Sequence, residues 1–129
     1  MKQSPSMDAW LKEAKMDPSA EKCGMYLTHN GVVRKTAKAM VRQGDMSAEP
    51  VTGLNFSYNE EKVNKAIQDA LKMDGIYYVK VWLNEGILDV GDDIMYVLIG
   101  GDIRPHVVDC LQSLVGTIKN TCVVEEELH

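Results

Sequence analysis

The sequence has little of what marks specialised classes of protein. Its three cysteines, Cys23, Cys110 and Cys122, form no CxxC motif, and phenylalanine occurs only once in 129 residues. An odd number of cysteines without close pairs predicts reduced thiols rather than a disulfide framework. The longest apolar run, "IMYVLIGG", is far too short for a transmembrane helix, which needs about 20 apolar residues. We therefore expect a cytoplasmic protein that does not span a membrane.

Charge narrows the function classes further. The formal net charge is -5 at pH 7, although 45% of the residues are hydrophobic. A general nucleic-acid-binding protein needs a broad basic surface to neutralise phosphates, so this charge argues against one. The N-terminal "MKQSPSMDAWLKEAKMD" also lacks the apolar stretch of a signal peptide. A small, locally basic pocket for an anionic ligand remains compatible with the composition.

Familiar catalytic and metal-binding signatures are missing as well. The sequence has no GxSxG, HExxH or phosphate-loop motif, and its histidines and cysteines do not follow the spacing of zinc ligands. We therefore predict neither a metal site nor a resident cofactor.

The hydrophobic pattern predicts one α+β domain over residues 1–129, with two main helices packed on a mainly antiparallel or mixed sheet. Residues 1–20 are expected to form a short N-terminal helix and a linker. Residues 35–50, rich in Gly, Asp, Ser and Pro, are expected to form an exposed, mobile loop. The main helices are predicted at 59–73 and 105–118. Strands are predicted at 23–34 (irregular near Asn30-Gly31), 54–58, 76–86, 93–101 and, as a short edge strand, 121–128.

One basic stretch, "RKTAKAMVR", stands out in this acidic chain. It contains no acid and carries Arg34, Lys35, Lys38 and Arg42. If it were helical, Arg34, Lys38 and Arg42 would recur every four residues on one face. Guanidinium groups grip phosphate or carboxylate with two parallel hydrogen bonds, so an anion site is one interpretation. A solvated loop with scattered charge is the other.

Two further positions could contribute to such a site. In "LIGGDIRPH", a strand and two glycines lead into a helix, whose free N–H groups favour anions and beside which Arg104 adds charge. Asp102 as an N-cap explains the same motif without a ligand. Lys119 follows the last apolar position of the second main helix, where the helix dipole favours a cation by ~0.3–1 kcal/mol. By position alone, a capping role accounts for Lys119.

The order of several segments resembles a known family. These segments are "GVVR", "LNFSYNEEKVNKAIQDAL", "NEGILDVGDDIMYVLIGGDIR" and "LVGTIK". Together they are similar to the MoaE-like family of large, catalytic subunits of molybdopterin synthase. The resemblance covers roughly residues 23–120, and it is most specific from Glu85 to Tyr96, where the family carries a similar "IGxLxxGDxxVxV".

The resemblance implies a fold, an activity and partners. The fold is α/β hammerhead-like, and the subunit forms a central homodimer that binds a small ubiquitin-like sulfur carrier at each end, giving a heterotetramer. The carrier's C-terminal Gly-Gly, as a thiocarboxylate, enters a pocket of the large subunit. There, sulfur passes to cyclic pyranopterin monophosphate in the biosynthesis of the molybdenum cofactor. Because that substrate is anionic, the pocket needs arginine and lysine side chains.

The resemblance also assigns roles to individual residues. Arg34 matches the family's arginine in "GxVR", Arg104 matches the arginine of an "HR" pair, and Lys119 matches the first active-site lysine. Lys35, Lys38 and Arg42 are expected to support substrate binding. A lysine in a partly desolvated pocket can orient the thiocarboxylate or shuttle a proton.

The chain departs from the family at three places. Ile103 stands where a histidine is expected, and the family's second active-site lysine falls on "VVEEE", at Glu125 or Glu126. An arginine-bearing C-terminal extension does not follow His129. The alternative to a working sulfurtransferase is therefore a family member that keeps the fold but acts as a non-catalytic binding or assembly partner. A third hypothesis is a thiol-dependent role for Cys122.

Overall fold

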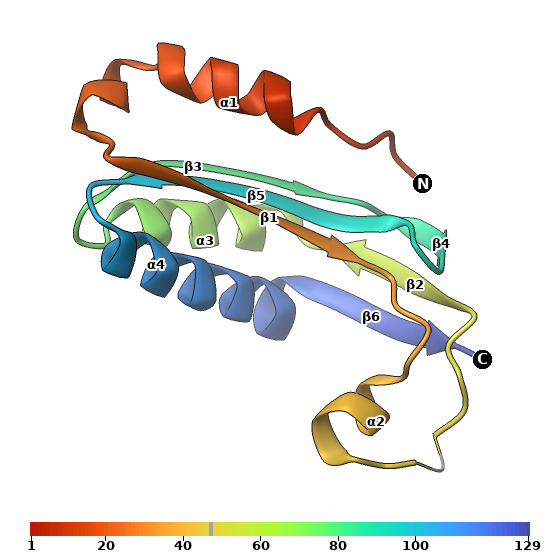
Figure 1. Cartoon of the computed structure of the whole chain (residues 1–129). Coiled ribbons are helices and arrows are strands. Elements are labelled where there is room, and N and C mark those ends of the chain that lie inside the picture. Colours follow the sequence, from red (N-terminus) through yellow and green to blue (C-terminus); the bar gives the residue numbers. More distant parts are fainter. Residues whose placement is uncertain (47) are drawn as a thin grey trace.

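A computed structural model of the chain describes residues 1–46 and 48–129. Figure 1 shows the order of the helices and strands. The helices are α1 (Met7–Met16), α2 (Lys38–Gln43), α3 (Glu60–Leu71) and α4 (Arg104–Thr117), with a 3₁₀ turn at Pro18–Lys22 and a π-helical turn at Ile118–Cys122. The strands are β1 (Met25–Val32), β2 (Gly53–Tyr58), β3 (Ile76–Leu83), β4 (Gly86–Asp89), β5 (Asp93–Gly101) and β6 (Val123–Leu128).

The predicted α+β class is confirmed, but the strands form two sheets rather than one. One sheet has the order β1-β5-β3 and the other β4-β2-β6, and every pairing among the described residues is antiparallel. The predicted irregularity in β1 is present as a register shift between Gly31 and Val32. The predicted edge strand is β6, which pairs with β2 and with no other strand that the structure describes. What the sequence did not predict is β4, which leaves the β3–β5 connection to pair with β2.

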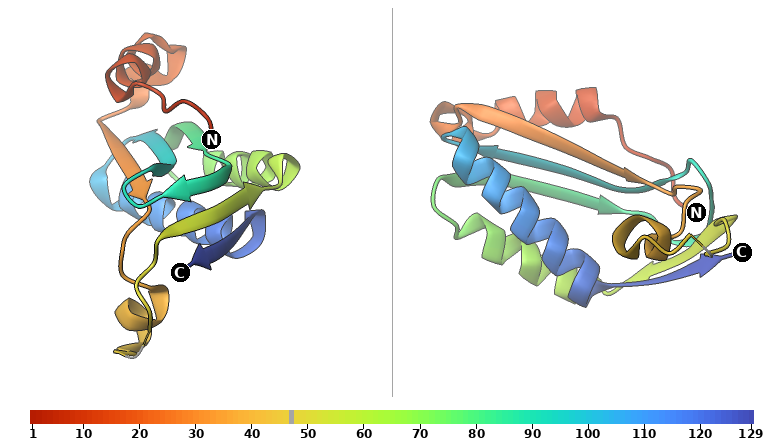
Figure 2. Two further views of the ribbon diagram at one scale, coloured as in Figure 1. Left: turned by 90° about the vertical axis from the view of Figure 1, so that its right-hand side faces the viewer. Right: turned by 60° about the horizontal axis from the view of Figure 1, so that its bottom comes forward.

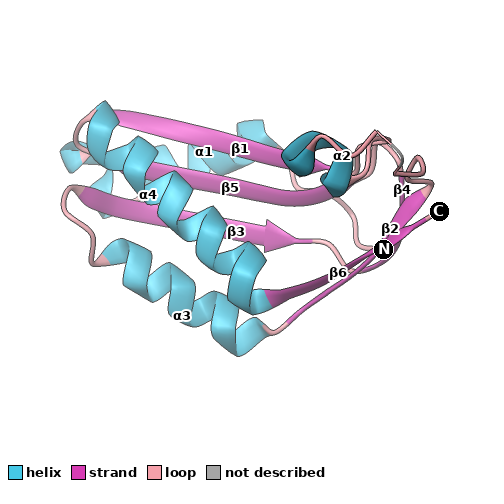
Figure 3. Ribbon diagram, turned by 90° about the horizontal axis from the view of Figure 1, so that it is seen from below, coloured by secondary structure: helices cyan, strands magenta, loops and turns pink. Residues whose placement is uncertain are grey.

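The first sheet lies between two helical layers (Figures 1 and 3). Its α1 face is covered through Trp10, Ala14 and Leu98, whereas Val97 and Ile99 belong to the larger cluster shared with α3 and α4. Alternate residues of β5 therefore enter different clusters. This explains why β5 is a nearly continuous apolar run rather than an alternating one. Of the described helices, none is both long and apolar enough to cross a bilayer.

The two main helices form where the sequence predicted them. Asn59 caps α3, because its side-chain oxygen accepts a hydrogen bond from the Lys62 amide at 3.0 Å. The capping prediction for α4 was wrong. Its N-cap is Ile103, which has no side-chain cap, and Asp102 lies one residue earlier. The Asp102 carboxylate instead accepts a hydrogen bond from the Ile103 amide and contacts His106 Nδ1.

The segment predicted as a loop contains the short helix α2. Its two ends are tied together by a hydrogen bond of 2.7 Å from the Val51 amide to the Lys35 carbonyl. Gly44 ends the helix in the left-handed conformation, at a φ of 67°. The segment projects from the body of the protein beyond the end of β1 (Figures 1 and 2). Lys38 contacts Glu125 and Glu127 of β6, so α2 lies beside that strand, near the site described below.

Candidate functional site

A half-open pocket lies between the end of β1, α2, β6 and the turn after α4. It encloses about 520 Å³ of empty space, including its open mouth. Apolar side chains such as Leu54 and Met95 line part of it. Its charged lining consists of three cations and two carboxylates, contributed by Arg34, Lys38, Lys119, Glu125 and Glu127.

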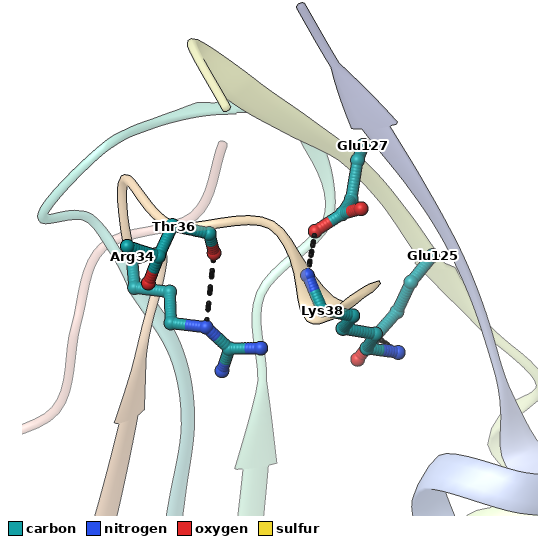
Figure 4. A network of polar contacts seen from close by, with 5 residues as sticks. All are labelled: Arg34, Thr36, Lys38, Glu125 and Glu127. Carbon is teal, nitrogen blue, oxygen red and sulfur yellow. Dashed lines mark hydrogen bonds and ion pairs between the residues drawn. The ribbon is translucent and has the colours of Figure 1, made fainter. Parts of the chain in front are cut away.

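Arg34 reaches the pocket because β1 ends just before it. The preceding residue, Val33, is only 4% exposed, and its amide donates to the Asp92 carbonyl at 3.0 Å. This anchor fixes the chain at the point where Arg34 leaves the sheet. The Nε of Arg34 donates to the Thr36 carbonyl at 3.0 Å, as Figure 4 shows. That bond uses one of the five N–H groups of the guanidinium, so the others remain able to bind an anion.

Lys119 reaches the pocket because α4 widens into a π-helical turn instead of ending. Ile118 is fully buried and anchors that turn, and Thr121 Oγ1 donates to the Thr117 carbonyl at 2.7 Å. Single π-helical turns often occur at functional sites. Lys119 is exposed to solvent and lines the pocket. The dipole at the end of α4 favours its charge as well, so a capping role and a pocket role hold together.

Lys38 is held by two glutamates of β6 (Figure 4). Its Nζ forms an ion pair with Glu125 Oε2 at 2.6 Å, and its backbone amide donates to Glu127 Oε2 at 3.0 Å. The second contact satisfies a free N–H in the first turn of α2, which Ala37 cannot do because it has no polar side chain. The two glutamates therefore fix α2 against β6 and hold Lys38 at the pocket.

The alternation of β6 decides which glutamates enter the site. Glu125 and Glu127 lie two residues apart on the face that lines the pocket, whereas Glu126 is exposed and does not line it. Of the two positions that the resemblance matches to the family's second active-site lysine, only Glu125 lines the pocket.

His29 lies beside the pocket, although the sequence did not indicate it as a site residue. It is two residues before Gly31, which lines the pocket, and so shares its face of β1. Burial lowers the pKa of His29, and the nearby charge of Lys119 lowers it further. Both effects favour the neutral form of the imidazole. Because side chains alternate along a strand, His29 must share a face with Gly31, and Glu127 with Glu125. The sequence could have predicted both residues at the pocket only if Gly31 and Glu125 had been known to face it.

The depressed pKa of His29 predicts how stability depends on pH. At pH values below 6.5, the ordinary pKa of histidine, the unfolded chain takes up a proton at His29 that the folded chain resists. The free energy of unfolding therefore falls as the pH drops through this value. His29→Gln should flatten this fall, measured by urea unfolding at several pH values. His129→Gln, at the exposed C-terminus, is the control and should keep it. An unchanged slope in His29→Gln would assign the proton uptake to other groups.

The other predicted cations lie elsewhere. Arg104 is in the first turn of α4, and this helix separates it from the Lys119 turn by about 20 Å of axial rise. Lys35 and Arg42 are exposed and do not line the pocket. The condition for a shared helical face of Arg34, Lys38 and Arg42 is not met, because α2 begins at Lys38 and leaves Arg34 outside it. Roles for Arg104, Lys35 and Arg42 in substrate binding remain predictions.

The two glycines before α4 are explained by packing. A Cβ on Gly101 would lie 2.6 Å from the Gly75 carbonyl oxygen, and one on Gly100 would lie 2.7 Å from the Tyr26 ring. Their role is close approach between chain segments rather than between the chain and a ligand. The Asp102 carboxylate also occupies the start of α4. This end of α4 is therefore a poor anion site.

The thiol hypothesis gains no support. Cys122 is 3% exposed, packs in the main core and does not line the pocket. In the described part of the chain, no three histidine, cysteine, aspartate or glutamate residues group to hold a metal ion.

Comparisons with known proteins agree on one family. The family model described as "MoaE protein" matches residues 2–121. Molybdopterin synthase from Staphylococcus aureus has a similar structure, with a TM-score of 0.71 at 15% identity, covering 99% of this chain and 92% of that one. The MoaE protein of Burkholderia ambifaria gives a TM-score of 0.71 at 16% identity, covering 98% of this chain and 84% of that one.

A third similar structure is a protein complex. It contains subunits 1 and 2 of the molybdopterin-converting factor from Helicobacter pylori, with a TM-score of 0.65 at 16% identity, covering 96% of this chain and 79% of that one. No curated protein sequence matches this chain. At such identities the structures show a common fold, whereas the family model spans nearly the whole chain. The chain therefore belongs to the MoaE protein family, and this membership supports a role in molybdenum cofactor biosynthesis.

Proposed function

We propose that this chain is the large subunit of a molybdopterin synthase. In this role it transfers sulfur from the C-terminal thiocarboxylate of a small ubiquitin-like carrier to cyclic pyranopterin monophosphate. One observation carries the proposal. Arg34 and Lys119 are far apart in the sequence but line the same pocket. Neither forms an ion pair with a carboxylate of the described residues. Both charges are therefore available to an anionic ligand.

The two free cations suit different parts of the reaction. The guanidinium of Arg34 can hold a phosphate oxygen pair with parallel hydrogen bonds. The ammonium of Lys119 can orient the thiocarboxylate and stabilise negative charge as sulfur attacks the substrate. Lysine can also release and take back a proton, which arginine cannot do near neutral pH.

The partners are part of the proposal. The Helicobacter pylori structure is a complex of two subunits, and by analogy this chain binds a small carrier whose Gly-Gly tail enters the pocket. We propose a homodimer of this chain with a carrier at each end, acting in the cytoplasm. The free cysteines suit a reducing compartment of that kind.

A second candidate function is a non-catalytic binding or assembly partner. The observation in its favour is the pair of carboxylates in the pocket, because Glu125 neutralises Lys38 where the family's second active-site lysine is expected. A carboxylate beside an anionic substrate weakens binding, since like charges repel more strongly where water is excluded. This candidate keeps the carrier-binding surface and lacks sulfur transfer.

A reconstituted reaction separates the two candidates. It contains this protein, a thiocarboxylated carrier from the same organism and cyclic pyranopterin monophosphate. Formation of the dithiolene product, detected by mass spectrometry, is the expected result, and a carrier with a plain C-terminal carboxylate is the control. Carrier binding without product would favour the second candidate. If the protein neither bound the carrier nor formed product, both candidate functions would be contradicted.

A further inference from the structure

The charged side chains of the pocket differ in whether they already have a partner of opposite charge. Arg34 and Lys119 have no carboxylate partner within the described chain, whereas Lys38 and Glu125 form an ion pair of 2.6 Å. The Glu125 side chain is only 12% exposed, so solvent screens this pair less than one on the open surface. To a ligand in the pocket, Lys38 and Glu125 act largely as a neutral dipole.

Glu127 reduces the positive potential further. Its Oε2 accepts a hydrogen bond from the Lys38 amide, which is a neutral donor. The bond orients the carboxylate but leaves its negative charge uncompensated. Among the described residues, two cations without a carboxylate partner and one carboxylate without a cation therefore face the same space. The potential there is positive but weak.

A weak positive potential favours some anions over others according to their charge. The attraction of an anion to the pocket grows in proportion to the anion's charge, whereas the cost of removing the anion from water grows with the square of that charge. In a strongly basic pocket the attraction dominates and a dianion binds best. In a weakly basic pocket the desolvation cost dominates and a monoanion is favoured.

We propose that Glu125 and Glu127 determine the ligand specificity of this pocket, so that it accepts singly charged anions in preference to doubly charged ones. The ligands that we expect to bind more tightly are phosphodiesters and thiocarboxylates. Phosphomonoester dianions are expected to bind more weakly. The inference rests on the proposed function only in using the same pocket as an anion site.

The experiment compares two probes of nearly the same size. Dimethyl phosphate carries one charge, and methyl phosphate carries about two at a pH well above its second pKa of about 6. Affinities are measured by NMR titration of the full chain at constant ionic strength, at about pH 8. The wild-type protein should bind dimethyl phosphate more tightly. Glu125→Gln removes one negative charge and should strengthen dimethyl phosphate binding about threefold and methyl phosphate binding about tenfold, because the gain scales with ligand charge.

Three variants test whether charge is the cause. Glu126→Gln, on the opposite face of β6, is the matched control and should change neither affinity. Lys38→Met leaves Glu125 unpaired and should weaken methyl phosphate binding more than dimethyl phosphate binding. The double variant Lys38→Met/Glu125→Gln removes both charges together and should restore a preference close to that of the wild type. Thermal unfolding of each variant shows that it is folded.

Two results would overturn the inference. If Glu125→Gln changes both affinities equally, or weakens them, the carboxylate does not discriminate by ligand charge. If the wild type binds neither probe, the pocket is not an anion site, and the proposed function loses its basis as well. Discrimination between the probes without sulfur transfer in the reconstituted reaction would leave this inference standing and contradict only the proposed activity.

Discussion

Lys119→Ala is expected to lower the rate of sulfur transfer by about 100-fold or more in the reconstituted reaction, with little change in stability. The magnitude is that of removing one group that stabilises developing negative charge in an active site. Stability should hold because Lys119 is exposed and its turn is anchored instead by the fully buried Ile118. Single-turnover product formation at saturating carrier measures the effect.

Two further variants make this result specific. Lys12→Ala removes an exposed lysine of α1, on the other side of the first sheet, and should leave the rate unchanged. Lys119→Arg keeps the positive charge but cannot release a proton near neutral pH. Recovery of the rate with arginine would limit Lys119 to anion binding, whereas continued loss would indicate proton transfer. A Lys119→Ala protein with full activity would contradict a catalytic role for this residue.

Helix α3 shows what local sequence can predict. Its start, cap and buried stripe follow from Asn59 and from the spacing of Val63, Ala66 and Ala70, all of which lie within one element. The division of the strands into two sheets has no such local signal. It depends on Gly86–Asp89 turning away from β3 to pair with residues of β2 that lie thirty or more positions earlier in the chain. That pairing is a tertiary property, and strand propensity alone is silent about it.

The sequence predicted a residue of the site only where that residue matched a family motif by itself. Arg34 and Lys119 could be singled out from the resemblance, and the structure brings them to one pocket. The partners of Lys38 could not be predicted, because Glu125 and Glu127 come from a strand almost ninety residues later. Arg104 shows the opposite limit. It was singled out from the same resemblance, but a motif does not show which end of a helix lines a pocket, so its role in substrate binding remains a prediction.

Phe56→Ala is expected to cost about 3–5 kcal/mol of the free energy of unfolding, the usual range for a buried phenylalanine. Phe56 is the one phenylalanine of the chain and is 1% exposed. It sits in the middle strand of the second sheet, opposite Gly86 on one side and Glu125 on the other. A small domain is stable by only about 5–15 kcal/mol, so this loss is a large share of the total. Urea unfolding followed by circular dichroism measures it.

The same substitution connects the core to the site. Within the described part of the chain, the edge strand β6 pairs only with β2, and it carries both glutamates that hold Lys38. A cavity under Phe56 should therefore loosen β6 and raise hydrogen exchange at the Lys38 amide. Phe56→Leu keeps most of the volume and should cost less than about 1.5 kcal/mol, with the Lys38 amide still protected. If Phe56→Ala left that amide as protected as in the wild type, the contacts of α2 would not depend on the packing of the second sheet.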